Sequence, residues 1–385
     1  MASSSALVLL KNASILITLS LFFLQVDGVL GCYTSIFSFG DSLVDTGNFN
    51  YTNESKHSCM KPPFGVTYFH RPTGRCSDGR MIIDFIAQGL GLPFLPAYLR
   101  HTNVQDFKQG VTFGEAGATG IDVPFFTSIG LKAYSNHSLS VQIGWFKDML
   151  PALCGSPSNC RNMLRSALFI VGEIGGNDYG DGLRAGRSLK VVRTFVPKVI
   201  KSISSAIQAL VNMGAVTVMA PGNMPMGCLP AFLTTFENNN PDDFDPSTGC
   251  LNGVNELCEY HNYLLQIELK KLREINPHTT IMYGDLYNAA SELFHFPEKL
   301  GFKNGALRGC CGGGGRYNYN DSARCGDEGS TVCDDITSYV QWDGYHYTEN
   351  AFKWVATGLL GPYSTPHINP SCVSLKSHSF DHPYF

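Results

Sequence analysis

Five short, continuous runs of apolar and β-branched residues constrain the fold of this chain more than any other feature. They lie at 35–40, 110–114, 167–172, 215–221 and 279–284. Strands buried on both faces of a parallel sheet read as continuous runs rather than as alternating ones. Helical patterns lie between them, at 79–90, within 141–150, at 189–213 and at 254–275, with a last helix expected at 349–360. Strands that alternate with helices predict one α/β sheet covered by helices on both faces.

The stretches between these elements include three long segments rich in Gly, Asn, Asp, Pro and Cys, at about 52–73, 229–249 and 309–339. Loops of that length in a compact domain are usually functional or tied by disulfides. We find no internal repeat and no linker long enough to separate two domains. We therefore expect residues 32–385 to form a single domain.

The amino terminus has the pattern of a secretory signal. Lys11 precedes an apolar stretch at 13–24, which is shorter than the roughly 20 residues of a membrane-spanning helix, and small and polar residues follow it. We predict a signal peptide at 1–28, cleaved between about 28 and 31; a buried N-terminal helix is the alternative. The end of the chain, 374–385, is polar and aromatic, so we expect no integral membrane segment in a secreted product. Extracellular space and vacuole both remain open as destinations.

The chain has thirteen cysteines, which agrees with an oxidising compartment. Spacing favours local pairs, Cys154 with Cys160, Cys250 with Cys258 and Cys325 with Cys333, but it does not fix connectivity, and an odd count leaves one thiol over. No C-x-x-C motif occurs, which disfavours a zinc ribbon. Four N-x-S/T sequons are candidate glycosylation sites, at Asn50, Asn53, Asn136 and Asn320.

The charge balance excludes some classes of partner. The chain has 28 Lys and Arg against 32 Asp and Glu, without a basic stripe, so neither nucleic acid nor an anionic membrane is expected to bind. No metal-ligand cluster and no dinucleotide fingerprint is visible, so we expect no cofactor and no metal. A small, neutral or hydroxylated ligand fits better, and the oligomeric state stays open.

A serine follows the first predicted strand, within Gly-Asp-Ser-Leu at 40–43. Open α/β sheets bind ligands at the carboxyl ends of their strands, so Ser42 is placed where a nucleophile could act. A serine needs a histidine within hydrogen-bond reach and a third group that orients the histidine. Asp343 and His346 have a spacing at which both side chains share one face of a turn, and the carboxylate can then hold the imidazole toward a serine. The G-x-S-x-G elbow of α/β-hydrolases is absent.

Two further segments offer hydrogen-bond donors for the oxyanion that forms during acyl transfer. Gly117 follows the second strand, where a glycine lets a backbone N–H approach a substrate, and Asn177 follows the third strand with a side-chain amide. Each alone is more readily interpreted as a strand-end turn. Together, at the ends of strands of one sheet, they point to a catalytic site.

These four segments in this order resemble the blocks of the GDSL (SGNH) esterase/lipase family, in its large secreted plant branch. Asn223-x-Pro225-x-Gly227-Cys228 and Cys310-Cys311-Gly312-Gly313 also resemble segments of that branch, and the similarity covers nearly the whole chain after the signal. Met226 departs from it, standing where the branch often has proline, and Glu115 replaces a smaller apolar residue.

The resemblance implies a flavodoxin-like α/β/α sandwich with a five-stranded parallel sheet. It implies Ser42 as nucleophile, His346 as general base and acid, and Asp343 as the residue that orients His346. The backbone N–H groups of Ser42 and Gly117 and the amide of Asn177 would form the oxyanion hole. The form of the second block is similar to that of members acting on acetyl, sinapoyl or other small acyl esters.

The expected function is therefore a secreted serine carboxylic-ester hydrolase that acts on short-chain or aromatic acyl esters of plant metabolites. The main alternative is an acyltransferase, because passing the acyl group to an alcohol uses the same acyl-enzyme. A non-catalytic secreted binding protein with the same fold is a third possibility, which the complete set of site residues disfavours.

Overall fold

The structure is a computed structural model that describes residues 32–49 and 58–373. The predicted signal peptide and the sequons at Asn50 and Asn53 lie outside these residues.

A six-stranded sheet forms the centre of the molecule, with the strand order β2-β1-β3-β4-β5-β8. The strands are β1 (Ser35–Phe39), β2 (Gly110–Thr112), β3 (Ala167–Val171), β4 (Thr217–Pro221), β5 (Thr280–Gly284) and β8 (Ser364–Thr365). Each of the five predicted runs contains one of the first five strands, and these pair in parallel. The order 2-1-3-4-5 is that of flavodoxin-like sheets. The expected count of five was one short, because β8, a two-residue strand antiparallel to β5, carries no hydrophobic run.

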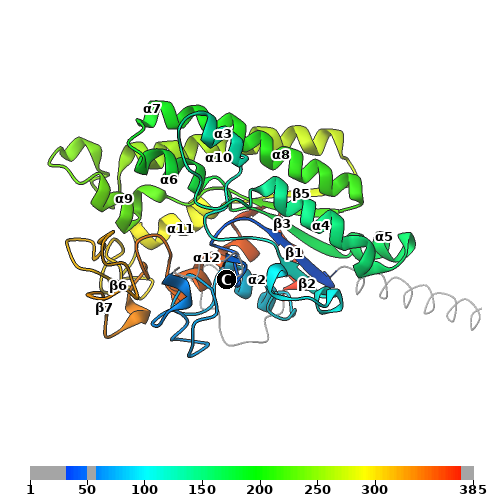
Figure 1. The fold of residues 1–385 in the computed structure, drawn as a ribbon, viewed down its shortest axis with the longest axis horizontal. Coiled ribbons are helices and arrows are strands. Elements are labelled where there is room, and N and C mark those ends of the chain that lie inside the picture. The colour runs from blue at the N-terminus through cyan, green and yellow to red at the C-terminus, as the bar shows by residue number, and fades with distance from the viewer. Residues whose placement is uncertain (1–31, 50–57, 374–385) are drawn as a thin grey trace, which may run out of the picture.

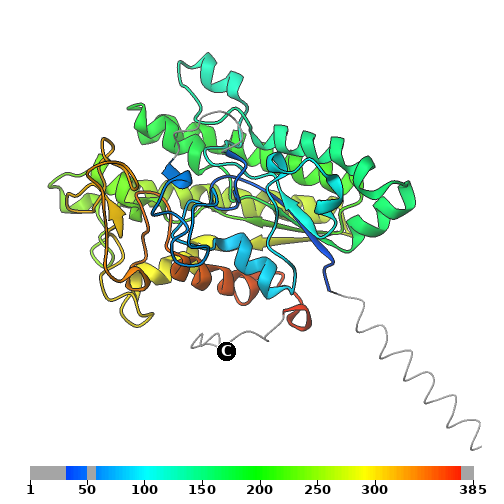
Figure 2. The same ribbon diagram turned by 60° about the horizontal axis from the view of Figure 1, so that its bottom comes forward.

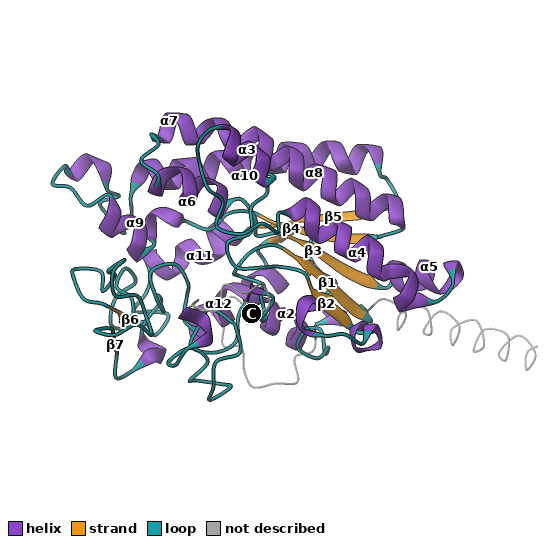
Figure 3. Cartoon of the chain, viewed as in Figure 1, coloured by secondary structure: helices purple, strands orange, loops and turns teal. Residues whose placement is uncertain are grey.

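Helices cover both faces of this sheet, as Figures 1 and 3 show. One layer contains α4 (Leu139–Cys154), α8 (Val196–Met213) and α10 (Asn252–Ile275), and the other contains α2 (Ile82–Gly89), α11 (Leu286–His295) and α12 (Glu349–Leu360). The rotated view in Figure 2 separates α2 and α12 from the upper layer. The predicted α/β/α sandwich is confirmed. None of the helices within the described ranges is both long and apolar enough to cross a bilayer.

Some helices differ from the expected boundaries. The single helix expected at 189–213 is divided into α7 (Leu189–Val192), a 3₁₀ turn and α8, which has a proline, Pro197, in its first turn. Proline lacks the N–H that an interior position needs and is tolerated in a first turn, so it marks the restart. Further helices within expected loops or turns are α3 (Val123–Ser128), α5 (Pro157–Arg165), α6 (Gly176–Arg184) and α9 (Pro230–Thr235).

The core between β1 and α4 is aromatic. Phe37 and Phe39 of β1 point to the α4 side, where both rings contact Phe146 at centroid distances of 5.1 and 5.7 Å. All three side chains are buried. Because burying large aromatic rings contributes several kcal/mol, this cluster anchors the strand that precedes Ser42.

Disulfides stabilise loops that have little regular structure. The described residues contain five, which join Cys59 to Cys76, Cys154 to Cys160, Cys228 to Cys250, Cys310 to Cys333, and Cys311 to Cys325. The expected pair Cys154–Cys160 is confirmed. The other two expected pairs are wrong.

The backbone explains both corrections. Leu251 N–H donates to the carbonyl of Gly227, which brings Cys250 beside Cys228 rather than beside Cys258 in α10. A small hairpin of β6 (Cys311–Gly312) and β7 (Thr331–Val332) places Cys333 beside Cys310, and its N–H donates to the Cys310 carbonyl at 2.9 Å. Sequence spacing carries neither of these backbone contacts.

Candidate active site

The turn after β1 presents Ser42 at the carboxyl edge of the sheet. Gly40 begins this turn with a φ of +155°, and a Cβ there would lie 2.8 Å from the carbonyl oxygen of Glu173, so only glycine fits. The side-chain amide of Gln142, on α4, donates to the Gly40 carbonyl at 2.8 Å and accepts from its N–H at 2.9 Å. The position of the serine is thus fixed by the strand before it and by the helix beneath it.

Asp45 holds the continuation of this turn. Its carboxylate accepts backbone N–H groups from Gly47 at 2.7 Å, Asn48 at 2.6 Å, Phe49 at 3.2 Å and Ala116 at 2.9 Å. Burial raises the pKa of Asp45 to about 6, although these hydrogen bonds favour its charged form. This buried carboxylate therefore joins the turn after β1 to the segment after β2.

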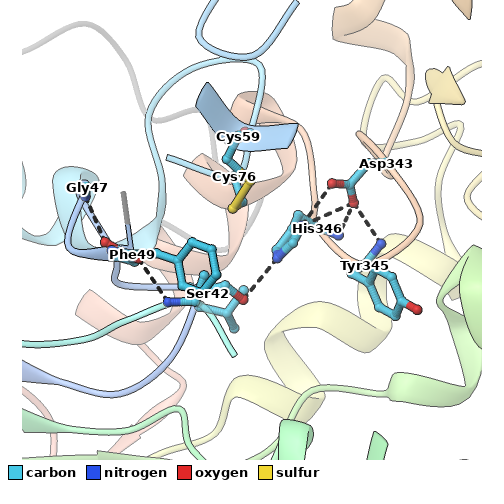
Figure 4. The surroundings of a disulfide bond; sticks show 12 residues. Ser42, Gly47, Phe49, Cys59, Cys76, Asp343, Tyr345 and His346 are labelled. Carbon is cyan, nitrogen blue, oxygen red and sulfur yellow. Dashed lines mark hydrogen bonds and ion pairs between the residues drawn. A yellow bond between two sulfur atoms is a disulfide. The ribbon is translucent and has the colours of Figure 1, made fainter. Parts of the chain in front are cut away.

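His346 and Asp343 lie on the opposite side of the site, as Figure 4 shows. His346 Nε2 lies 2.9 Å from Ser42 Oγ, and His346 Nδ1 lies 2.9 Å from Asp343 Oδ2. Asp343 Oδ1 also accepts the backbone N–H groups of Tyr345 at 2.7 Å and of His346 at 2.8 Å. These bonds close the tight turn that gives both side chains their common face.

The charges of this pair reinforce one another. Burial lowers the pKa of His346, but the charge of Asp343 and the hydrogen bond with it outweigh burial and raise the pKa above its ordinary value. Burial likewise acts to raise the pKa of Asp343, and the charge of His346 reverses this and lowers it. Such an arrangement stabilises an imidazolium, which is what a histidine becomes when it takes a proton from a serine.

Gly117 and Asn177 flank Ser42 in the same cavity. Neither Ser42 N–H nor Gly117 N–H donates to any acceptor among residues 32–49 and 58–373, so both are available to a ligand. Gly117 has a φ of +81°, and the ring of Tyr134 packs against it. Asn177 Nδ2 lies 3.1 Å from Asp41 Oδ2 and 3.1 Å from the carbonyl oxygen of Ala118. The structure thus brings the residues predicted for catalysis and for the oxyanion hole into one place.

The cavity around Ser42 has a volume of about 320 Å³. Its wall includes Met226 and combines apolar and charged side chains that the sequence analysis did not single out, namely Lys132, Tyr134, Glu173, Asp181, Arg184, Met224, Leu229, Phe232, Arg324 and Tyr345. They come from several loops and helices, and no local motif marks them. Of these residues, only Glu173 could have been found from the sequence, because it follows the end of a strand, as Asp41 does.

Glu115, which departs from the family pattern, does not line this cavity. Its carboxylate is buried and accepts from Ser135 Oγ at 2.9 Å, and it lies 2.5 Å from His137 Nδ1. Asp178, beside Asn177, accepts the N–H groups of Gly120 and Ile121 at 2.8 and 2.9 Å. Burial raises the pKa of Asp178 to about 7. Both acids act inside the protein and support the loops around the site.

The described part of the chain holds no group of three or more His, Cys, Asp or Glu that could bind a metal ion. Among the sequons, Asn136 and Asn320 are exposed. Glycosylation there stays a prediction.

A mostly parallel, flavodoxin-like sheet with a Ser–His–Asp hydrogen-bonded series at its carboxyl edge is an arrangement found in serine hydrolases of α/β/α architecture, and comparison with known proteins agrees. The sequence model of the family described as GDSL-like Lipase/Acylhydrolase matches residues 36–359, and the chain belongs to this family. It is a carboxylic ester hydrolase.

Curated relatives from plants cover most of this chain. The chain is 48% identical over 347 residues to GDSL esterase/lipase At1g28590 of Arabidopsis thaliana, covering 89% of this chain and 86% of the relative. It is 44% identical over 378 residues to GDSL esterase/lipase At1g28600 of the same plant, covering 97% and 94%. It is also 45% identical over 350 residues to sinapine esterase of Brassica napus, covering 90% of each chain.

Proposed function

We propose that this chain is a secreted serine esterase, a single hydrolase domain that uses Ser42, His346 and Asp343 and acts on short-chain or aromatic acyl esters. The observation that carries this proposal is the continuous series from Ser42 Oγ through both nitrogens of His346 to Asp343. A serine without such a partner is a weak nucleophile.

The reaction would proceed in two halves. His346 Nε2 takes the hydroxyl proton while Ser42 Oγ attacks the ester carbonyl carbon. The oxyanion then accepts from the N–H groups of Ser42 and Gly117 and from the amide of Asn177. When the tetrahedral intermediate collapses, the alcohol leaves with the proton from His346. Water, deprotonated by His346, attacks the acyl-enzyme, and the acid departs as Ser42 regains its proton.

The size and lining of the cavity support small acyl groups. A volume of about 320 Å³ lies at the lower end of the usual range for ligand cavities. Phe232, Tyr345 and Tyr134 present aromatic surface, against which an aromatic acyl group would stack. The relative named sinapine esterase is in keeping with an aromatic acyl ester.

Secretion is supported by the cysteines. Ten of them form the five disulfides, and such bridges persist in oxidising compartments. A chain that passes through that route would carry glycans at exposed sequons, of which Asn136 and Asn320 are examples.

The test is hydrolysis of a series of p-nitrophenyl esters, from acetate to palmitate, by purified protein and by Ser42→Ala. We expect activity that falls with acyl length and a loss of at least roughly 10³-fold in the variant, with its thermal unfolding unchanged. Analysis of the products with an added alcohol separates hydrolysis from transfer, since a new ester would establish an acyltransferase. Undiminished turnover by Ser42→Ala would refute the proposed nucleophile.

A further inference from the structure

Two buried carboxyl groups meet beside the nucleophile, and the proposed mechanism gives neither of them a role. Asp41 follows β1 and Glu173 follows β3, the neighbouring strand, and both line the cavity although they are only 4% and 5% exposed. Asp41 N–H donates to the backbone carbonyl of Glu173, and the two side chains are hydrogen-bonded to each other. No Lys or Arg in the described ranges forms an ion pair with either.

A hydrogen bond between two carboxyl groups requires a proton, so this pair carries one proton and one negative charge. The acceptors indicate where each lies. Asp41 accepts two N–H groups, from Leu43 at 3.0 Å and from Asn177 Nδ2 at 3.1 Å, whereas Glu173 accepts one, from Gly176 at 3.3 Å. Burial raises the pKa of Glu173 well above its ordinary value and that of Asp41 to about 6. Glu173 is therefore the donor, and Asp41 is the ionised acceptor.

The carboxylate of Asp41 fixes the direction of the Asn177 amide. An Asn amide has two hydrogens, and those of Asn177 point to Asp41 Oδ2 and to the carbonyl of Ala118. When an oxyanion forms, one hydrogen turns to it and the other keeps its acceptor. The bond to a carboxylate is the stronger of the two, so the bond to Asp41 is the one that persists.

We propose that Asp41 and Glu173, sharing one proton, are positioning residues that aim the Asn177 amide at the oxyanion. This proposal rests on the proposed function. Glu173 has a second effect, because its proton limits the pair to a single negative charge. Two carboxylates beside a developing oxyanion would repel it and raise the barrier.

Other charged and titratable groups face this pair. His346 attracts Asp41 electrostatically, and Asp178 of α6 disfavours ionisation of Glu173. Burial raises the pKa of Tyr179 of α6 and of Cys258 of α10, and the charge of Glu173 raises both further. Both groups therefore stay neutral near pH 7. No Lys or Arg in the described ranges forms an ion pair with Glu173, so loss of its proton leaves a charge without a direct partner.

The experiment compares kcat, KM and pH profiles of Asp41→Asn and Glu173→Gln with those of the wild type. Asp84→Asn is the matched control, because Asp84 is a buried carboxyl that bonds the Arg75 guanidinium and does not line the cavity. In Asp41→Asn we expect kcat to fall roughly 10- to 100-fold with KM within about twofold, while Asp84→Asn changes mainly the unfolding temperature.

Glu173→Gln gives the sharper readout. An amide still donates to Asp41 but cannot lose its proton. We expect wild-type kcat to rise with pH as His346 becomes neutral and to fall at high pH as Glu173 ionises. Glu173→Gln should keep the first limb and lose the second.

The outcomes separate the two proposals. If Ser42→Ala stays active, the proposed function fails, and the positioning role fails with it. If Ser42→Ala is inactive but Asp41→Asn matches Asp84→Asn in kcat, or Glu173→Gln keeps the high-pH limb, only the positioning role is overturned.

A second inference concerns the two ends of the described chain. Cys32 and Cys372 lie outside the five disulfides, and the Cys32 thiol donates to the carbonyl of Ser371 at 3.7 Å. The thiol of Cys372 is hydrogen-bonded to that of Cys32. Cys32 is exposed, so an oxidant can reach it.

We infer that Cys32 and Cys372 form a sixth disulfide in the secreted protein. The two thiols lose two protons and two electrons, and the electrons reduce a protein disulfide or glutathione disulfide to its two thiols by exchange. This bridge would connect the segment before β1 to the segment after β8, which lie near the two ends of the described chain. It leaves Cys258, buried in α10, as the single remaining thiol.

Alkylation of the denatured, unreduced protein from a secretory host tests this bridge. We expect one labelled thiol, at Cys258, and a linked peptide pair that contains Cys32 and Cys372. Cys32→Ser, Cys372→Ser and the double variant should lower the unfolding temperature equally, since each removes the same bond. Labelling of both Cys32 and Cys372, or a bridge from either one to Cys258, would overturn the inference.

Discussion

The two sides of the site are built in different ways. Ser42 lies on a turn after a buried strand, whose backbone is held by Gln142 and by the carboxylate of Asp45. Asp343 and His346 lie at the end of a segment with almost no regular structure, residues 309–347, which we call the cysteine loop. Two disulfides, Cys310–Cys333 and Cys311–Cys325, lie within it.

Backbone hydrogen bonds connect the disulfides of the cysteine loop to the turn that carries Asp343 and His346. Cys310 N–H donates to the carbonyl of Gln341 at 2.9 Å, and Cys311 N–H donates to that of Trp342 at 2.7 Å. Trp342 N–H in turn donates to the His346 carbonyl at 2.8 Å. The nucleophile is therefore fixed by hydrophobic packing and buried hydrogen bonds, and the histidine by covalent bridges. Each side should fail under a different perturbation.

The largest effect should come from Asp343→Asn, on the side of the cysteine loop. An amide cannot stabilise the imidazolium and favours the wrong tautomer, so we expect kcat to fall roughly 10³- to 10⁴-fold. Steady-state kinetics on p-nitrophenyl acetate measures it. Asp335→Asn, on an exposed turn of the same loop, is the matched control and should retain full activity. A decrease below tenfold would refute the role of Asp343.

Asp45→Ala should instead destabilise the side of the site that carries Ser42, which we call the strand side. It leaves four backbone N–H groups without their acceptor, and we expect the free energy of unfolding to fall by about 3–5 kcal/mol. Urea denaturation followed by circular dichroism measures this loss. Asp106→Ala serves as control, because Asp106 is exposed and its ion pair with His101 should contribute less than about 1 kcal/mol. Equal stability of both variants would contradict the importance of Asp45.

Removing the bridge Cys310–Cys333 should separate the two sides most clearly. We expect the double serine variant to lose about 2–4 kcal/mol of stability, and its activity should disappear at a lower urea concentration than the signal of the sheet. The matched control removes Cys154–Cys160, which joins α4 to α5 far from the site in Figure 1. In that control, activity and secondary structure should disappear together. Coincident transitions in both variants would argue against a separately stabilised cysteine loop.

The same contrast explains what could be predicted from the sequence. The strand side follows local rules, because β1, β3, β4 and β5 are continuous apolar runs and each is followed by a turn at the same sheet edge. The sequence therefore predicts that Ser42, Gly117 and Asn177 lie close together, and in the structure they line one cavity. The short spacing of Asp343 and His346 also identified their shared turn.

The missed features depend on contacts between distant segments. Cys310 pairs with Cys333 because a hairpin of two strands brings them together. Strands of only two residues are too short to show a pattern of β-branched residues in the sequence. The pair Asp41–Glu173 forms because β1 and β3 are neighbours in space, although 132 residues separate the two acids. The hydrogen bonds of Gln142 to Gly40 likewise join positions 102 residues apart.

The smallest expected effect is a pH dependence of stability that comes from the strand side. Burial raises the pKa of Asp41 and Asp45 to about 6 and that of Asp178 to about 7, so between about pH 4 and 7 the folded state binds more protons than the unfolded state. Stability should then fall as pH rises through that range. His261, whose pKa burial lowers to about 3, acts in the opposite direction, but burial also raises the pKa of Asp78, Glu173 and Asp181.

We therefore expect the thermal unfolding temperature to be a few degrees higher at pH 5 than at pH 7.5, as measured by calorimetry. Asp178→Asn should weaken this dependence, because one raised carboxyl is removed. The bridges of the cysteine loop do not titrate, so the N–H groups next to them should be affected less than those of the strand side. Hydrogen exchange can locate it: faster exchange at pH 7.5, after correction for the intrinsic rate, should appear at Gly47, Ala116 and Gly120, whose N–H groups these carboxylates accept. A uniform change that includes the N–H groups of Cys310 and Cys311 would show that the two sides unfold as one unit.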